Sequence, residues 1–480
     1  MRLISRVSVL SCIALGACKD STAPSSSSRL LAFVVQPPSR TAPGVVLAPA
    51  PQVEVRFLSG ERDTSADVDL SLVLGPGHPR ARLLGTTTVR AVAGVAVFDD
   101  LSIDSSGSVA LYASGVGGLK GSSELFRVVV PFSSLSSSVF QSCATTPNGD
   151  AYCWGENSQQ QLGVGAASPQ LFPARVQAAA GIAFTAIGVG RVHACALTSV
   201  GSLYCWGLSD GSALGDGTGE NRTAPALVHT PAGLTFTALS VGHYHACAIA
   251  SNGTTYCWGA NYYGELGDGT GHTPLEPVAV AAPAGVSFTQ VSPGLWHTCA
   301  VTGLGAAYCW GAKDYGDLGD GTGDSSWIPI AVKAPAGVSF ASVSAGTMHS
   351  CGLTPAGAAY CWGRNDGGGL GDGSTTASAI PVPVQMPSGV GFKAISAGQF
   401  RTCAISATGA AYCWGGDGTT KPTLLTLADP RPMESISLSL GGEACMLSTI
   451  GLAYCWGAND FGQIGDGTQQ PRSTPVAVSH

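Results

Sequence analysis

The stretch Gly242-His243-Tyr244-His245-Ala246-Cys247-Ala248 decides the fold, together with Tyr256-Cys257-Trp258-Gly259 and Leu266-Gly267-Asp268-Gly269-Thr270, which follow it. The core of this stretch, Cys-x9-Cys-Trp-Gly, occurs seven times. The first cysteines of the first six copies are spaced by 52 residues, and the last interval is 42 residues. These cysteines are Cys143, Cys195, Cys247, Cys299, Cys351, Cys403 and Cys445.

Each copy of the motif belongs to a repeat of about four short strands. A Pro-Val strand, a Pro-Ala-Gly turn and a Phe-x-x-Val/Leu-Ser strand follow the Leu-Gly-Asp-Gly-Thr segment in most copies. A four-stranded unit of this size cannot bury both of its faces alone, whereas radial stacking of such units buries them. We therefore expect an all-β fold whose main body is a β-propeller.

Written as G-x-x-H-x-C-A-x4-G-x-x-Y-C-W-G-x-N-x-x-G-x-L-G-D-G-T, the repeat resembles that of the regulator of chromosome condensation family in its bacterial, cysteine-containing form. The resemblance covers residues 131–480 and implies seven blades. The chain ends on the strand-like run Pro475 to Val478, while 131–138 stands where a Phe-x-x-Val-Ser strand belongs. We expect this first strand to complete the C-terminal blade and so close the ring.

The two cysteines of each repeat are expected to form a disulfide bond. Reflecting the hairpin about residue 200 places Cys195 opposite Cys205, and opposed residues of an antiparallel pair lie within disulfide range. Zinc, the competing interpretation, needs two C-x2-4-C knuckles, which isolated C-x9-C pairs do not supply. We predict no metal or cofactor and seven bridges: Cys143–Cys153, Cys195–Cys205, Cys247–Cys257, Cys299–Cys309, Cys351–Cys361, Cys403–Cys413 and Cys445–Cys455.

Three other recurring residue types are interpreted as structural. The tryptophan after each second cysteine suits packing between blades. One aspartate per Gly-Asp-Gly-Thr loop is too few for calcium and suits a turn. A ring of imidazoles would suit a transition metal, but the family resemblance implies a histidine that recurs with the fold and bonds the backbone. The residues are Trp154, Trp206, Trp258, Trp310, Trp362, Trp414 and Trp456; Asp216, Asp268, Asp320, Asp372 and Asp466; and His193, His245, His297 and His349.

The candidate partner-binding residues are large side chains that vary from repeat to repeat. One set precedes the histidine position, and a second follows Cys-Trp-Gly. If their loops open on one face, they form an aromatic collar of the kind that anchors protein interfaces. The alternative is packing between blades. The candidates are Phe140, Tyr244, Trp296, Met348 and Phe400 in the first set, and Tyr262, Tyr263, Tyr315 and Phe461 in the second.

The N-terminal part differs in sequence character from the repeats. Residues 1–18 resemble a bacterial lipoprotein signal peptide, with Leu15-Gly16-Ala17 before a Cys18 that would become the lipid-modified terminus. Residues 19–30 indicate a flexible linker. Residues 31–130 contain about seven short β-like runs, which favour a β-sandwich. The segment Gly94 to Leu101 resembles bacterial immunoglobulin-like surface domains, which usually act as spacers.

Charge and motif content restrict the function. The net charge is −7 without any cluster of Lys or Arg, which excludes a typical nucleic-acid-binding protein. No Gly-x-Ser-x-Gly, His-Glu-x-x-His or phosphate-loop motif is present, so we expect no enzyme. Guanine-nucleotide exchange, known for the nuclear namesake of the family, needs an insertion and a basic tail that this sequence lacks. We expect a monomeric, exported protein, anchored to the outer membrane or cell surface, that binds a protein partner or alternatively a glycan.

Overall fold

The computed structural model describes residues 28–41, 43, 45–75, 81–103, 107–427 and 431–479. Two compact units divide the chain, one up to Val128 and one from Val129 onward. The expected signal peptide, Cys18 and most of the expected linker lie outside the described residues. Within the described residues, no helix is long and apolar enough to cross a membrane.

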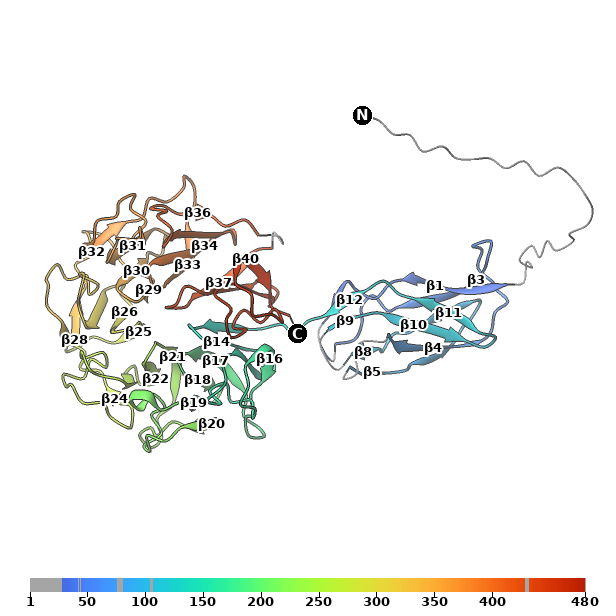
Figure 1. Ribbon diagram of the computed structural model, residues 1–480, viewed down its shortest axis with the longest axis horizontal. Helices are drawn as coiled ribbons and strands as arrows, with labels where there is room; N and C mark the ends of the chain where they lie inside the picture. Colours follow the sequence, from blue (N-terminus) through green and yellow to red (C-terminus); the bar gives the residue numbers. More distant parts are fainter. Residues whose placement is uncertain are drawn as a thin grey trace, which may run out of the picture. The chain divides into compact units, whose positions relative to one another are not determined.

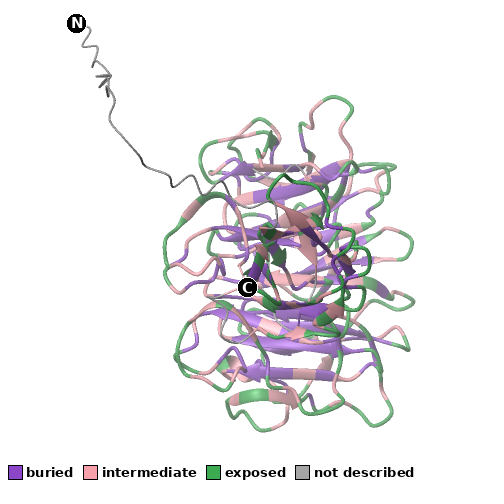
Figure 2. Cartoon of the chain, turned by 90° about the vertical axis from the view of Figure 1, so that its right-hand side faces the viewer, coloured by how far each residue is buried: buried purple, intermediate pink, exposed green. Residues whose placement is uncertain are grey.

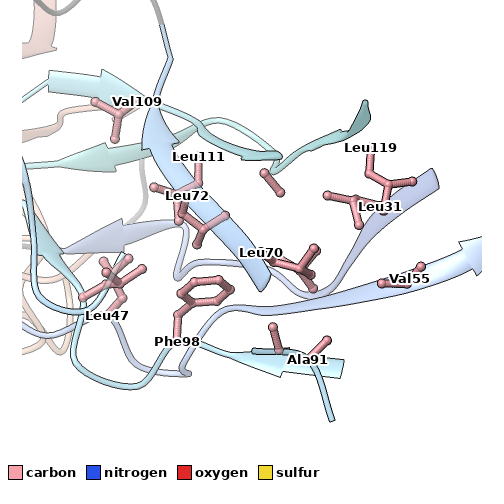
Figure 3. Close-up of a cluster of buried hydrophobic side chains, with 14 of the residues drawn as sticks. Leu31, Leu47, Val55, Leu70, Leu72, Ala91, Phe98, Val109, Leu111 and Leu119 are labelled. Atoms are coloured by element: carbon pink, nitrogen blue, oxygen red, sulfur yellow. The ribbon is translucent and has the colours of Figure 1, made fainter. Parts of the chain in front are cut away.

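The N-terminal unit consists of short strands around one apolar core. Its sheets have the orders β1-β3-β7, β11-β10-β4-β6, β2-β12-β9 and β5-β8. Phe98 and Leu70 lie at the centre of the core, fully buried (Figure 3). The strands are β1 (Arg29–Val35), β2 (Arg40–Thr41), β3 (Gln52–Phe57), β4 (Asp69–Leu74), β5 (Leu83–Leu84), β6 (Thr88–Arg90), β7 (Val95–Val97), β8 (Ser102–Ile103), β9 (Gly107–Val109), β10 (Leu111–Gly115), β11 (Leu119–Ser122) and β12 (Phe126–Val128).

The strands of this unit are shorter and more numerous than the sequence suggested. The apolar segment from Thr87 to Phe98, for example, contains two strands, β6 and β7, because Ala93 and Gly94 turn with positive φ angles of 48° and 79°. A Cβ on Gly94 would lie 2.3 Å from the carbonyl oxygen of Asp63, so the close approach of the two segments requires glycine. The immunoglobulin-like assignment stays a prediction.

The second unit contains seven four-stranded antiparallel sheets arranged around a central axis (Figure 1). We number them blades 1 to 7 in chain order. Their first strands line a central cavity and are therefore the inner strands. The inner strands are β13 (Ser134–Ser137), β17 (Phe184–Val189), β21 (Phe236–Val241), β25 (Phe288–Pro293), β29 (Ser342–Ala345), β33 (Phe392–Ala397) and β37 (Met433–Leu438).

The second and third strands form the hairpin that carries the two cysteines of each repeat. The second strands are β14 (Gln141–Thr145), β18 (His193–Thr198), β22 (His245–Ala250), β26 (His297–Thr302), β30 (His349–Leu353), β34 (Arg401–Ser406) and β38 (Ala444–Ser448). The third strands are β15 (Ala151–Gly155), β19 (Leu203–Gly207), β23 (Thr255–Gly259), β27 (Ala307–Gly311), β31 (Ala359–Gly363), β35 (Ala411–Gly415) and β39 (Ala453–Gly457).

The outer strand of each blade comes from the Pro-Val segment. It has only two residues in blade 3 and in blade 6, and of these two repeats only that of blade 6 has the shorter spacing. One 3-10 turn, η1 (Asp210–Ser212), precedes the outer strand of blade 2. The outer strands are β16 (Gln170–Arg175), β20 (Arg222–Leu227), β24 (Val278–Ala279), β28 (Ser326–Ala331), β32 (Ser378–Pro383), β36 (Thr423–Leu424) and β40 (Arg472–Ala477).

The predicted closure of the ring is wrong. The strand from 131–138 does not complete the C-terminal blade; as β13 it pairs with β14 in blade 1. Blade 7 already has its own inner strand, β37, so no position there is open. Contacts between neighbouring blades close the ring instead: Ser137 N donates to Ser437 Oγ at 3.0 Å, and Phe132 N donates to Gly451 O at 2.8 Å.

Burial follows the strands. Buried residues lie along the strands, and exposed residues gather in the connecting loops (Figure 2). The apolar clusters of the second unit join successive blades: one contains Cys143 and Leu162 of blade 1 together with Phe184 and Trp206 of blade 2. The hydrophobic core of the propeller is therefore divided among the junctions between blades.

Candidate functional site

The alternation of strand direction places two sets of loops at the same end of the propeller. The loop from the inner to the second strand and the loop from the third to the outer strand both follow strands that run in the same direction. The first loop carries the residue before the histidine position, and the second carries the residues after Cys-Trp-Gly. We call this end the collar face.

The aromatic candidates of the collar face contact one another across repeats. Trp296 stacks on Tyr244 with a centroid distance of 5.1 Å, and Tyr263 meets Trp296 edge-on at 5.6 Å. Phe140 and Phe461, from the two ends of the ring, meet edge-on at 5.6 Å. The collar residues before the histidine position are half-buried, while Tyr262 and Tyr263 are 60% and 49% exposed. The two predicted sets therefore meet in partly exposed aromatic groups on this face: Tyr244 and Trp296 with Tyr263, and Phe140 with Phe461.

Two arginines that the sequence analysis did not select belong to the same surface. The guanidinium of Arg364 lies 5.0 Å from the ring centroid of Tyr315 and 4.8 Å from that of Phe400. Its Nη1 lies 3.2 Å from Met348 Sδ. Arg191 lies over Phe140 at 5.5 Å. A signal was present in the sequence, because Arg364 is the only cation directly after Cys-Trp-Gly in the seven repeats.

A pocket of 230 Å³ opens on the collar face between blades 2, 3 and 4. The stacked rings of Tyr244 and Trp296 form one part of its lining. The remaining lining residues are Asp210, Gly211, Ala260 and Tyr262.

A second cavity, of 270 Å³, is the central channel. Serines at the ends of the inner strands line it and join neighbouring blades: Ser292 Oγ accepts a hydrogen bond from Ala345 N at 3.0 Å, and Ser344 Oγ accepts one from Ala397 N at 2.9 Å. These hydroxyls are thus engaged in holding the ring together.

The cysteines stand directly opposite one another in every blade, as in the pair Cys195 and Cys205. Seven disulfide bonds join them, each across ten positions of sequence, with Cα–Cα distances of 4.0–4.1 Å. Each bond therefore fixes the hairpin whose two ends flank the collar face.

The Gly-Asp-Gly-Thr loops are held by internal hydrogen bonds. Asp268 accepts from Thr270 N at 2.9 Å and from Thr270 Oγ1 at 2.7 Å. Asn261, which is fully buried, donates to Thr270 O and His272 O and accepts from Leu266 N. Asn261 therefore organises its loop and does not belong to the exposed collar, although it follows Cys-Trp-Gly.

The four histidines do not bond the backbone as expected. His245 Nε2, His297 Nε2 and His349 Nε2 each lie 2.8 Å from a hydroxyl oxygen of the next blade. That hydroxyl in turn donates to a backbone carbonyl; Ser350 Oγ, for example, bonds Asp317 O at 3.0 Å. The prediction of a structural histidine named the wrong partner, because it considered one repeat alone and the partner lies in the next repeat.

Burial keeps these imidazoles neutral. It lowers the pKa of His193, His245 and His297 to about 3 and that of His349 to about 4. Among the residues that the structure describes, no three His, Cys, Asp or Glu side chains are grouped so as to hold a metal ion.

The tryptophans after the second cysteine pack between blades, as predicted. Trp310 Nε1 donates to Glu265 O of the preceding blade at 2.9 Å, and Trp362 and Trp414 make the equivalent bonds. These indoles are fully buried. They are consequently unavailable for ligand binding, in contrast to Trp296.

Two buried carboxyl groups lie beneath the collar face. Burial raises the pKa of both Glu265 and Asp317 to about 7. Asp317 Oδ2 lies 3.7 Å from His297 Nδ1. Neither residue was among the functional residues predicted from the sequence. The position before Leu-Gly varies freely in charge between repeats, and that variation was the available signal.

Taken with the seven four-stranded sheets, these features define a repeat propeller whose variable aromatic residues gather on one face. Residues 135–421 match the family model of the RCC1-like domain, and residues 451–480 match that of the regulator of chromosome condensation (RCC1) repeat. The chain therefore belongs to the RCC1-like domain family.

Several known proteins are similar to this chain. The ultraviolet-B receptor UVR8 of Arabidopsis thaliana is 30% identical over 55% of this chain and 60% of its own length. The human E3 ubiquitin-protein ligase HERC2 is 31% identical over 55% of this chain but only 6% of its own length. The chain thus spans less than two thirds of these curated relatives.

Solved structures share the fold. Prp20p from Saccharomyces cerevisiae superposes with a TM-score of 0.60 at 20% identity, over 73% of this chain and 88% of its own. Human WBSCR16 superposes with a TM-score of 0.62 at 19% identity, over 69% and 94%.

Proposed function

We propose that this protein is a non-enzymatic recognition or scaffold protein of the bacterial cell envelope that binds a protein partner through its collar face. The observation that carries this proposal is the continuous set of partly exposed rings from Tyr262, Tyr263 and Trp296 to Tyr244. Interface centres are enriched in tyrosine, tryptophan and arginine, and the two aromatic residues supply large contact areas at a low cost in conformational entropy.

The family supports a binding role without naming a partner. Prp20p is described with its binding to Gsp1p and histones, and Kap60 is bound to yeast RCC1 in another solved structure. Those partners belong to those proteins. For this chain, the residues that vary between repeats determine which partner would bind, since fold alone does not establish function.

The test is a cross-linking pull-down from cell envelopes with the full chain. The collar variant combines Tyr244→Ala, Trp296→Ala and Phe400→Ala. A matched control combines Val200→Ala, Leu304→Ala and Ile450→Ala, which remove exposed apolar side chains from the hairpins at the opposite end of the blades. We expect the parent and the control to retain one envelope protein that the collar variant loses. Equal retention by all three proteins would contradict the proposal.

Glycan binding is the second candidate, because exposed aromatic rings stack on sugars as well as on proteins. The exposed faces of Tyr262 and Tyr263 favour it. A set of immobilised envelope glycans, probed with the same three proteins, separates the two: a glycan held by the parent and lost by the collar variant favours this candidate.

We further propose that the chain is exported and anchored through a lipid on Cys18, with the N-terminal unit acting as an immunoglobulin-like spacer. The lipobox-like sequence before Cys18 supports the anchor. Cys18→Ala tests it: the protein should leave the membrane fraction, whereas unchanged membrane association would contradict the proposal.

A further inference from the structure

The positions that line the pocket on the collar face recur two repeats further along the chain, where most of them hold different residues. Every residue that lines the pocket has an equivalent 104 positions later, which is two 52-residue repeats. The pairs of equivalent residues are Asp210 and Asp314, Gly211 and Tyr315, Tyr244 and Met348, Ala260 and Arg364, Tyr262 and Asp366, and Trp296 and Phe400.

In the later repeat, the side chain of Arg364 occupies the position that corresponds to the pocket. The guanidinium of Arg364 lies between the rings of Tyr315 and Phe400, at 5.0 and 4.8 Å from their centroids. Arg364 Nε donates to Asp366 Oδ1 at 2.7 Å, and Nη1 lies 3.2 Å from Met348 Sδ. The later place is thus a guanidinium site made of aromatic rings, a thioether and a carboxylate.

In the earlier repeat the arginine is absent and its surroundings are kept only in part, because Gly211 stands where Tyr315 stands in the later repeat. Alanine stands at position 260 in place of the arginine, which leaves the 230 Å³ pocket. Trp296 replaces phenylalanine, and tryptophan attracts a cation over its face more strongly than phenylalanine does. Tyr244 replaces methionine, and Tyr262 stands where Asp366 pairs with Arg364, but Asp210 of the neighbouring blade supplies a carboxylate to the lining.

We propose that this pocket binds the guanidinium group of an arginine side chain from the protein partner. The inference rests on the proposed function and specifies its chemistry. A planar guanidinium stacks on aromatic rings and pairs with a carboxylate at the same time, which a neutral or purely apolar side chain cannot do. The arginine would stand where Arg364 stands in the later repeat, with its plane against Trp296 and Tyr244.

The direct test titrates the full chain with N-acetyl-arginine amide and follows the indole N–H signal of Trp296 by NMR, assigned with Trp296→Phe. N-acetyl-citrulline amide, of nearly the same shape but neutral, is the matched control ligand. We expect a saturable shift with the arginine derivative, with a dissociation constant on the order of 1–10 mM, and no saturable shift with the citrulline derivative. Equal responses, or no response to either, would overturn the inference. A neutral disaccharide that moves the signal when arginine does not would overturn it in favour of a glycan.

Variants of the chain make the test specific. Ala260→Arg introduces the side chain found in the later repeat and should abolish the response while leaving the unfolding temperature unchanged. Asp210→Asn should weaken binding about two- to fivefold, as expected for loss of an exposed ion pair. Arg364→Ala should open the equivalent site, so that the methyl signal of Met348 responds to the arginine derivative only in this variant. An unchanged affinity in Ala260→Arg would overturn the inference.

The pull-down separates failure of this inference from failure of the proposed function. If the partner protein is lost with the collar variant but retained with both Ala260→Arg and Asp210→Asn, the collar face binds a partner without an arginine in the pocket. The inference then fails and the proposed function stands. If the arginine derivative binds in the pocket but no envelope protein is retained, the guanidinium site stands and the proposed function fails.

Discussion

Two junctions of the propeller show how differently equivalent contacts can be made. Between blades 4 and 5, His297 Nε2 bonds Ser350 Oγ at 2.8 Å, and Ser350 Oγ donates to Asp317 O at 3.0 Å. Between blades 2 and 3, alanine stands at position 246 where the hydroxyl would be. The equivalent histidine, His193, is 1% exposed, and its Nε2 has no hydrogen-bond partner among the residues that the structure describes.

The inner strands differ at the same two junctions. Ser292 Oγ accepts from Ala345 N between blades 4 and 5. Between blades 2 and 3 the corresponding position is Gly188, where a Cβ would lie 2.7 Å from Val241 Cγ2. The indole bond is present at both junctions, since Trp258 Nε1 donates to Ala213 O at 3.1 Å. Apolar packing and the indole therefore suffice to join two blades, and the polar chain is an addition made at some junctions only.

The largest expected effect comes from Asp317, a carboxyl group of the junction of blades 4 and 5 whose place is taken by Ala213 between blades 2 and 3. Its pKa is raised to about 7 by burial, with a smaller contribution from Asp314, so the native state binds its proton more tightly than the unfolded state does. Stability is therefore full below the ordinary pKa of 3.8 and is lost as the pH rises through about 7. Asp317→Asn should raise the free energy of unfolding at pH 8 by on the order of 2 kcal/mol. Denaturant titrations at pH 4 and pH 8 check this, and an equal gain at both pH values would contradict it.

The next largest change in the free energy of unfolding is expected when the hydroxyl group of Ser350 is removed at the same junction. Ser350→Ala leaves His297 Nε2 buried without a partner, as His193 Nε2 already is. We expect the free energy of unfolding to fall by about 1–3 kcal/mol, the cost of an unsatisfied buried polar group. The matched control is Ser342→Ala, on the inner strand of the same blade. A fall no larger than that of the control would show that the polar chain does not stabilise the junction.

The reverse substitution should make the weaker junction resemble the stronger one. Ala246→Ser offers a hydroxyl to His193 Nε2 and a donor toward the carbonyl of Ala213. The expected gain is about 0.5–1.5 kcal/mol, the net value of one intramolecular hydrogen bond. Chemical denaturation of the variant, alone and combined with His193→Ala, measures it. The gain should vanish in the combined variant, and its persistence there would assign it to another cause.

The smallest effect is expected on the collar face. Tyr263 is 49% exposed and contacts Trp296 by its edge. Tyr263→Ala should change the free energy of unfolding by no more than about 0.5 kcal/mol, which is typical of a surface substitution. A thermal unfolding curve of the variant tests this, and a loss as large as that of Ser350→Ala would mean that the collar serves to join blades.

The comparison of junctions also explains what the sequence could predict. The 52-residue period predicts the strands and the register of Cys195 with Cys205, because both depend on residues close together within one hairpin. The partners of His245, His297 and His349 were missed because each lies in the next repeat, as Thr402 does for His349. A comparison of adjacent repeats contains that signal, since a hydroxyl follows the histidine position in blades 1, 4, 5 and 6.

The candidate site was predicted as a surface but not in its detail. The collar residues were found because they vary within a regular pattern, as Tyr244 and Trp296 do. Arg364 and Asp210 were missed because their importance depends on which rings face them, and those rings come from neighbouring blades. The closure of the ring was predicted wrongly for a related reason: the repeat pattern does not say at which strand a blade begins.

The absence of a shared strand has an evolutionary consequence. Each blade is formed by four strands that are consecutive in the chain, so the boundary of a blade coincides with the boundary of a repeat. Duplication of one 52-residue segment in the gene would therefore add a complete sheet without breaking the hydrogen-bond ladder of any other. In blade 6, where the interval between first cysteines falls to 42 residues, all four strands are still present, so a repeat of this kind tolerates a shorter outer segment while its inner three strands keep their place in the ring.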